Sequence, residues 1–192
     1  MNILLDEMPC HIEICGKKYP VNTDFRVWMR FEELLLSEEA EKAFAKAIIL
    51  CLKPERNFKN ELPPSFKETI KALCDFYFCR TGEENARKSS SGGGKRVYSF
   101  THDANLIYAA FMQQYGIDLT KCDLHWWAFR ELFSALSGNA KICSVMRIRA
   151  MDLTDVAKGA PRNRLAKLKA IYALPDFKSD EEREAELAEA LW

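Results

Sequence analysis

The sequence has 192 residues, of which 48% are hydrophobic and 29% are charged. This composition suits one domain or slightly more, with a sizeable hydrophobic core, and it excludes a disordered tail. Twenty-eight basic residues balance 28 acidic ones, so the whole chain has no net charge to attract nucleic acid or an anionic membrane.

The sequence lacks the usual signals for secretion and for membrane insertion. The longest candidate segment, residues 45–52, is far shorter than the ~20 residues that span a bilayer. The N-terminal residues include no basic region and carry acids early, unlike a secretion signal. The cysteines are scattered, odd in number and without a Cys-x-x-Cys pair, which is typical of reduced thiols in a cytoplasm. We therefore expect the protein to remain where it is made.

The N-terminal part predicts a hairpin. Between residues 11 and 21, apolar side chains at Ile12, Ile14, Tyr19 and Val21 alternate with polar or small neighbours, and Gly16 supplies the turn. This alternation is the pattern of two short paired strands. Because an isolated hairpin is marginal in water, we expect it to pack on the helices that follow.

Two helices are predicted next, over residues 24–36 and 38–52. Side-chain oxygens of residues 22–24 can cap the first helix, and Ser37 can cap the second. The first helix gathers bulky side chains on one face: Phe25, Trp28, Phe31 and Leu35. Such a face is typical of an amphipathic helix.

A third helix is predicted from Ser65 to about Arg80, because Ser65 and Glu68 have the spacing of a capping box. Its buried face should consist of Phe66, Ile70, Leu73 and Tyr77.

Residues 82–95 hold almost nothing that could be buried, and their Ser-Gly run is typical of a linker. A phosphate-binding loop is rejected, because its pattern requires glycine at Ser89 and serine or threonine at Arg96.

The C-terminal half predicts further helices. One opens at Asp103 and is stopped by Gly116, and the next runs from about residue 123 to 138 with Thr120 or Asp123 as its cap. Others are expected over residues 140–150, after Pro161 and, with an acidic composition, over residues 179–192.

These elements predict a mainly α protein, a bundle of about seven helices with a short N-terminal β-hairpin. We expect residues 1–81 to form a hairpin and helical part, residues 82–97 a linker, residues 98–178 a second helical part, and residues 179–192 a terminal helix.

The sequence shows no arrangement of residues that would bind a metal or a cofactor or catalyse a reaction. No two of its three histidines lie four residues apart, and none lies at metal-ligand spacing from a cysteine. Glycine patterns of nucleophile elbows and dinucleotide loops are absent. His125 shares the apolar side of its predicted helix, where a histidine is usually a packed and hydrogen-bonded core residue. We therefore expect no enzyme, no metal and no cofactor.

Trp127 falls on the polar side of the same predicted helix. A tryptophan there is either covered by another segment, for which the hairpin or the terminal helix are candidates, or available to anchor a partner. Sequence reasoning leaves both interpretations open.

Basic residues concentrate between residues 141 and 172. A patch that could contact phosphates would include Arg147, Arg149, Arg162, Arg164, Lys167 and Lys169. The acidic residues after 179 could instead neutralise it. Aromatic residues that would stack on bases are nearly missing among these cations, which disfavours nucleic acid as a partner.

Three blocks of the sequence are similar to the bacteriophage gp-fifteen family, which is found in tail gene cassettes of long-tailed phages and prophages. The first block is residues 19–28, from Tyr-Pro-Val-Asn-Thr-Asp to Trp28. The second is residues 103–111, 115–120 and 124–129, the last reading Leu-His-Trp-Trp-Ala-Phe. The third is residues 146–149 with 167–169 and 172–175.

The family has no established catalytic residues, so the resemblance implies none in this chain. The position of its genes near the tape-measure gene implies a tail-assembly role. A chaperone that binds the helical tape-measure protein in the host cytoplasm is the leading hypothesis. A structural part of the tail is the alternative, and a nucleic-acid-binding module is a third. Candidate partner anchors are Phe25, Trp28, Trp126 and Trp127. At least two of these four should be buried core residues.

Overall fold

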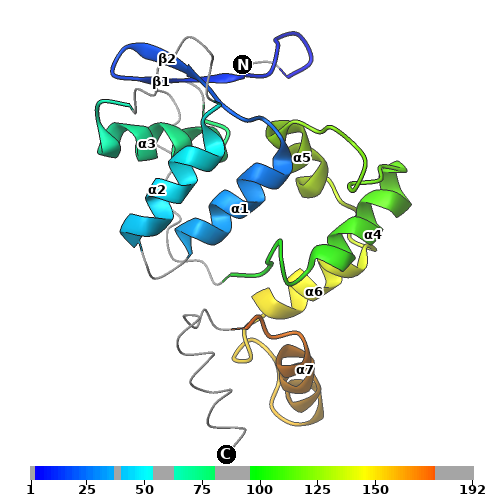
Figure 1. Ribbon diagram of the computed structural model, residues 1–192. Helices are drawn as coiled ribbons and strands as arrows, with labels where there is room; N and C mark the ends of the chain where they lie inside the picture. Colours follow the sequence, from blue (N-terminus) through cyan, green and yellow to red (C-terminus); the bar gives the residue numbers. More distant parts are fainter. Residues whose placement is uncertain (1–2, 37–39, 54–62, 81–95, 176–192) are drawn as a thin grey trace, which may run out of the picture. The chain divides into compact units, whose positions relative to one another are not determined.

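The computed structural model describes residues 3–36, 40–53, 63–80 and 96–175 (Figure 1). These residues form seven helices and one two-stranded antiparallel sheet, which confirms the predicted mainly α fold with an N-terminal hairpin. The predicted cap Ser37, most of the predicted linker over residues 82–97, and the predicted terminal helix over residues 179–192 lie outside the described residues.

Contacts divide the described residues into two units. Unit 1 contains residues 3–80 as described above together with residues 123–129, and unit 2 contains residues 96–122 and 130–175. Unit 1 is therefore discontinuous in the sequence, since it takes a short segment from the C-terminal half of the chain. The predicted division around residues 82–97 does not anticipate this segment.

The hairpin of unit 1 is formed by β1 (His11–Ile14) and β2 (Lys17–Pro20). Its two-residue turn places Cys15 at φ 50° and Gly16 at φ 77°, the positive values that such tight turns require. One face of the hairpin is buried, through Ile12, Ile14 and Tyr19. Strand β1 packs against α3, so the hairpin is supported by a helix as expected.

Helix α1 (Phe25–Leu35) begins where Asp24 caps it: the Asp24 carboxylate accepts the Arg26 backbone N–H at 2.8 Å. Its bulky face is buried through Phe25, Trp28 and Phe31, while Leu35 is only half-buried. Helix α2 (Ala40–Cys51) packs against both α1 and α3.

Helix α3 (Phe66–Tyr77) shows the predicted cap at its start. Ser65 Oγ accepts the Glu68 backbone N–H at 3.3 Å. The predicted burial of Phe66 is wrong, because its side chain is 52% exposed. Phe66 is the first residue of the helix, and its ring meets Phe44 of α2 edge-on, with ring centroids 5.9 Å apart, instead of entering the core.

The C-terminal end of α3 lies at Tyr77, three residues before the predicted end. Cys79 has φ 57°, and its N–H bonds the Phe76 carbonyl at 3.0 Å while the Arg80 N–H bonds the Asp75 carbonyl at 2.8 Å. These two bonds form a Schellman motif, which usually has glycine at the left-handed position. Because the motif contains no glycine here, composition alone could not place the end of this helix.

Unit 2 contains α4 (Ala104–Tyr115), α6 (Lys141–Ala150) and α7 (Ala160–Ile171). Helix α4 ends at Gly116, which has φ 67° and whose N–H bonds the Met112 carbonyl, as predicted. Helix α6 packs against α4 and against α7. Helix α5 (Trp126–Ser134) begins in unit 1 and ends in unit 2.

Candidate functional site

All four candidate anchors lie in the core of unit 1. The exposed fraction is 3% for Phe25, 0% for Trp28, 0% for Trp126 and 5% for Trp127, which confirms that at least two of them are core residues. Their rings contact other aromatic residues: Phe25 stacks on Phe129 with ring centroids 4.9 Å apart, while Trp127 meets Phe76 at a tilt. Packing therefore accounts for all four side chains, and none presents an exposed ring. A role in partner binding stays a prediction.

The two adjacent tryptophans of α5 both bind the C-terminal end of α3. Trp126 Nε1–H donates to the Tyr77 carbonyl at 2.9 Å, and Trp127 Nε1–H donates to the Phe76 carbonyl at 2.9 Å. The last carbonyls of a helix have no partner within the helix. The Trp126 indole supplies a donor to the Tyr77 carbonyl, and the Trp127 indole adds a second donor to the Phe76 carbonyl, which also accepts the Cys79 N–H. Trp127 is thus covered by α3 through Phe76, and the terminal helix, one of the two predicted covers, lies outside the described residues.

Backbone contacts fix the same segment to the start of α1. The Phe25 N–H donates to the Leu124 carbonyl at 3.1 Å, and the Trp126 N–H donates to the Thr23 carbonyl at 2.8 Å. Residues 123–129 are therefore held at two places in unit 1: the end of α3 and the beginning of α1. Nothing local in the sequence points to either contact, because both join segments far apart in the chain.

His125 caps α5, in place of the predicted Thr120 or Asp123. Its Nδ1 accepts the Trp127 backbone N–H at 3.0 Å, so the ring proton lies on Nε2 and is donated to the Pro9 carbonyl at 3.0 Å. Burial lowers the pKa of His125, and the hydrogen bond to Pro9 opposes this only in part. The half-buried ring is neutral and hydrogen-bonded on both nitrogens, which fits the expected structural role.

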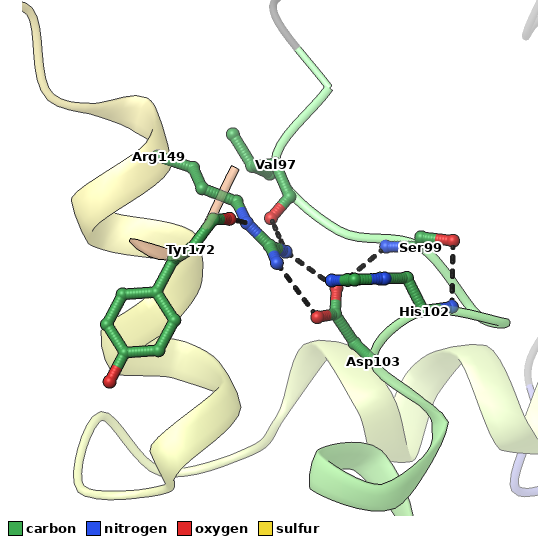
Figure 2. A network of polar contacts seen from close by, with 6 residues as sticks. All are labelled: Val97, Ser99, His102, Asp103, Arg149 and Tyr172. Atoms are coloured by element: carbon green, nitrogen blue, oxygen red, sulfur yellow. Dashed lines mark hydrogen bonds and ion pairs between the residues drawn. The ribbon is translucent and has the colours of Figure 1, made fainter. Parts of the chain in front are cut away.

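In unit 2, Arg149 and Asp103 form a buried ion pair (Figure 2). Arg149 Nη1 lies 2.6 Å from Asp103 Oδ2, and Arg149 Nη2 lies 2.9 Å from Asp103 Oδ1. The guanidinium also donates to two backbone carbonyls, to Val97 at 3.0 Å and to Tyr172 at 2.6 Å. One side chain of α6 thus binds residues before α4 and after α7.

Asp103 stands at the start of α4 as predicted, but its side chain makes no capping hydrogen bond. Its carboxylate instead accepts the Ser99 N–H at 2.9 Å and binds Arg149. Burial by itself would raise the pKa of Asp103, but the hydrogen bonds from Arg149 and Ser99 and the charge of Arg149 lower it overall. The pair is ionised and satisfied.

The side chain of Lys169 in α7 also forms hydrogen bonds within unit 2. Its Nζ donates to the Arg149 carbonyl at 2.9 Å and to the Met151 carbonyl, both at the C-terminal end of α6, where a cation is favoured. Arg149 and Lys169 therefore do not belong to an exposed basic patch, which corrects the prediction for these two residues. Arg147, Arg164 and Lys167 are exposed, and Arg162 is half-exposed.

Within the described ranges, no three His, Cys, Asp or Glu side chains lie close enough to hold a metal ion. Over the same ranges, no helix is both long and apolar enough to cross a membrane.

The profile of the family described as Bacteriophage Gp15 protein matches residues 4–174. The chain belongs to this family. The Gp15 assignment makes it a phage-related structural or assembly protein. No curated protein and no solved structure matches the chain.

The blocks that carry the Gp15 resemblance include the side chains of the Arg149–Asp103 ion pair and the two indoles that bind the end of α3. The second block holds Asp103, Trp126 and Trp127, and the third holds Arg149 and Tyr172. In this Gp15 protein these residues join segments distant in the sequence, by an ion pair in unit 2 and by indole hydrogen bonds in unit 1. The side chains of these blocks therefore hold distant segments together within each unit.

Proposed function

We propose that the protein is a non-enzymatic phage tail-assembly factor that binds the tape-measure protein and keeps it soluble before assembly. The single observation that carries this proposal is membership of the Bacteriophage Gp15 protein family over residues 4–174. The small helical units suit reversible binding of a long helical chain, because helices dock into apolar surfaces by side chains spaced three or four residues apart.

Exposed apolar side chains support binding to a protein. Leu4 and Leu5 are neighbours in the sequence and are 88% and 83% exposed, and Ile49 of α2 is 75% exposed. Adjacent leucines at the surface are candidates for contact with a partner, in contrast to the four buried aromatic anchors.

Co-expression with a tape-measure fragment tests the proposal. The soluble fraction of the fragment should rise in the presence of the full chain, and the two should co-purify. The Leu4→Ser/Leu5→Ser variant should reduce both effects if this surface is used, while Lys121→Ser, at an exposed position on the surface of unit 2, serves as a control. No gain in solubility together with no co-purification would refute the tape-measure assignment.

Purified virions distinguish a chaperone from a structural tail subunit. A chaperone should be absent from finished particles when their proteins are quantified by mass spectrometry. A fixed copy number per particle would instead identify a structural component and overturn the chaperone proposal.

A further inference from the structure

Helix α7 carries an open, mainly apolar groove of about 440 Å³, lined by Ala160, Pro161, Arg164, Leu165 and Leu168. Four of these five residues are apolar, and Arg164 is the charged one. They recur along nine residues of α7, which is about two and a half turns. The groove therefore follows one side of the helix.

The apolar row continues beyond the groove. Ile171, three residues after Leu168 and seven after Arg164, is 71% exposed. Residues at these spacings share one face of a helix. An exposed isoleucine next to an apolar groove enlarges the surface that a partner could cover.

The groove has a positive border. The sequence of α7 contains four basic residues and no acidic ones. Lys169 is engaged by the end of α6, but Arg164 and Lys167 are exposed and Arg162 is half-exposed. No carboxylate of α7 itself compensates these charges, so the surface favours an acidic partner.

We propose that this groove docks an acidic amphipathic helix of a partner protein. The apolar stripe of the partner helix would fill the space along Pro161, Leu168 and Ile171, and its carboxylates would face Arg164 and Lys167. This inference rests on the proposed function, because it names the chemistry of the partner segment that one surface of this assembly factor binds.

A helix explains the surface better than a nucleic acid does. Four of the five lining residues are apolar, whereas phosphate contacts require cations. Helix α7 contains no aromatic residue on which a base could stack. The buried Arg149 and the engaged Lys169 are unavailable for phosphates.

The test uses the full chain and a fluorescent peptide designed as a helix, with leucine on one face and glutamate on the other. Fluorescence anisotropy should show saturable binding that weakens with added salt. The double substitution Arg164→Glu/Lys167→Glu should weaken binding about tenfold, and Ile171→Ser should also weaken it. Arg147→Glu introduces one such charge change on α6 and should leave binding within about twofold of the original value.

Circular dichroism checks that each variant is folded. If the Arg164→Glu/Lys167→Glu variant is not folded, Arg164→Gln/Lys167→Gln replaces it, and the expected loss of affinity for the peptide is smaller. A matched peptide with lysine in place of glutamate should not bind.

The proposal would be overturned by no binding of the acidic peptide, by equal weakening through Arg147→Glu, or by binding of duplex DNA in place of the peptide. Self-association of the chain that is lost in the Arg164→Glu/Lys167→Glu variant, without peptide binding, would identify a second copy as the occupant of the groove. That result would also overturn the proposal.

Co-purification with the tape-measure fragment separates the docking proposal from the proposed function. If that fragment co-purifies while the peptide does not bind, the docking inference fails and the proposed function stands. If the peptide binds while the fragment does not co-purify, the tape-measure assignment fails instead.

Discussion

Arg149 and Asp103, 46 residues apart in the sequence, meet in the interior of unit 2 with their side chains 5% and 3% exposed. A planar guanidinium matches a carboxylate at two points, and here both contacts are at or below 2.9 Å. The same guanidinium binds the Val97 and Tyr172 carbonyls. The contact therefore joins the segment before α4, the end of α6 and the residue after α7.

Removal of either member of this pair should strongly destabilise unit 2. Arg149→Met or Asp103→Leu leaves an unpaired buried group, at a cost of about 3–5 kcal/mol in the free energy of unfolding. Arg149→Lys keeps the charge but loses the two-point contact, so it should also be less stable than the original chain. Denaturant unfolding of the full chain measures each value.

The double variant Arg149→Met/Asp103→Leu provides the control. Because no charge remains unpaired, it should lose less stability than the two single variants together. Strict additivity in this cycle would contradict a direct interaction between the two side chains.

Acid should weaken the same contact. The folded-state pKa of Asp103 is lowered overall, so its contribution to stability is fully present above its unfolded pKa of about 3.9. That contribution is lost as the pH falls through the lower folded-state pKa. Unfolding curves between pH 5 and 2 should show a steeper loss for the original chain than for Arg149→Met/Asp103→Leu.

The indoles of Trp126 and Trp127 should determine how firmly the end of α3 is held. Trp126→Phe or Trp127→Phe keeps an aromatic ring but removes one hydrogen bond to a carbonyl of α3, which should cost about 1–3 kcal/mol. Hydrogen exchange at the Phe78 and Arg80 amides should accelerate.

Tyr115→Phe is a matched control for these variants. It removes a side-chain hydrogen bond to the Leu132 carbonyl within unit 2, so exchange at the end of α3 should not change. Unaltered exchange in both tryptophan variants would show that the indoles do not hold this helix end.

His125 should make unit 1 sensitive to mild acid. Its pKa is lowered by burial, so the neutral ring is favoured in the folded state. The stabilisation is complete above the unfolded pKa of about 6.5 and declines as the pH falls through the folded-state value. Protonation of Nδ1 also removes the acceptor that caps α5.

His125→Asn retains a side-chain acceptor that can cap a helix but does not titrate. The free energy of unfolding should therefore fall less between pH 7.5 and 5.5 in this variant than in the original chain. An equal fall in both chains would assign the pH dependence to other groups.

Thiol reactivity should follow burial. Burial, together with the nearby Cys74, raises the pKa of Cys51 to about 12, so almost no reactive thiolate forms at pH 8. Cys10 and Cys15 are exposed and should be alkylated first by limiting iodoacetamide, as followed by peptide mass spectrometry. Denatured protein, in which every cysteine should react, is the control; labelling of Cys51 as fast as Cys15 in the folded chain would contradict the assignment.

Local signals in the sequence predicted most of the helices and the hairpin. Ser65 with Glu68 and Gly116 at the end of α4 act as expected, because each cap involves residues within one turn of the helix end. The predicted end of α3 is wrong, because a Schellman motif without glycine ends the helix earlier. Asp103 stands at the predicted start of α4, but its carboxylate binds the distant Arg149 and makes no capping hydrogen bond.

The candidate sites were less predictable than the fold. Phe25, Trp28, Trp126 and Trp127 are candidate anchors from the sequence, and only Trp127 is unusual in its helix position, but a helix wheel cannot say what covers any of them. Arg149 and Lys169 were grouped with the exposed cations, because sequence shows charge and spacing but not the carbonyl or carboxylate that each cation binds. The groove on α7 is not predictable from the sequence, since helical spacing does not show which apolar residues of a helix stay uncovered.

By itself, the sequence determined the helical character, the turn at Gly16 and the burial of the α1 face, because these follow from side-chain periodicity and from hydrogen bonds between near neighbours. Only the tertiary structure decided that Trp127 binds the Phe76 carbonyl, 51 residues away, and that Arg149 is a buried partner of Asp103. Such pairings depend on which surfaces pack together in the folded chain, and the pattern of neighbouring residues does not specify that packing.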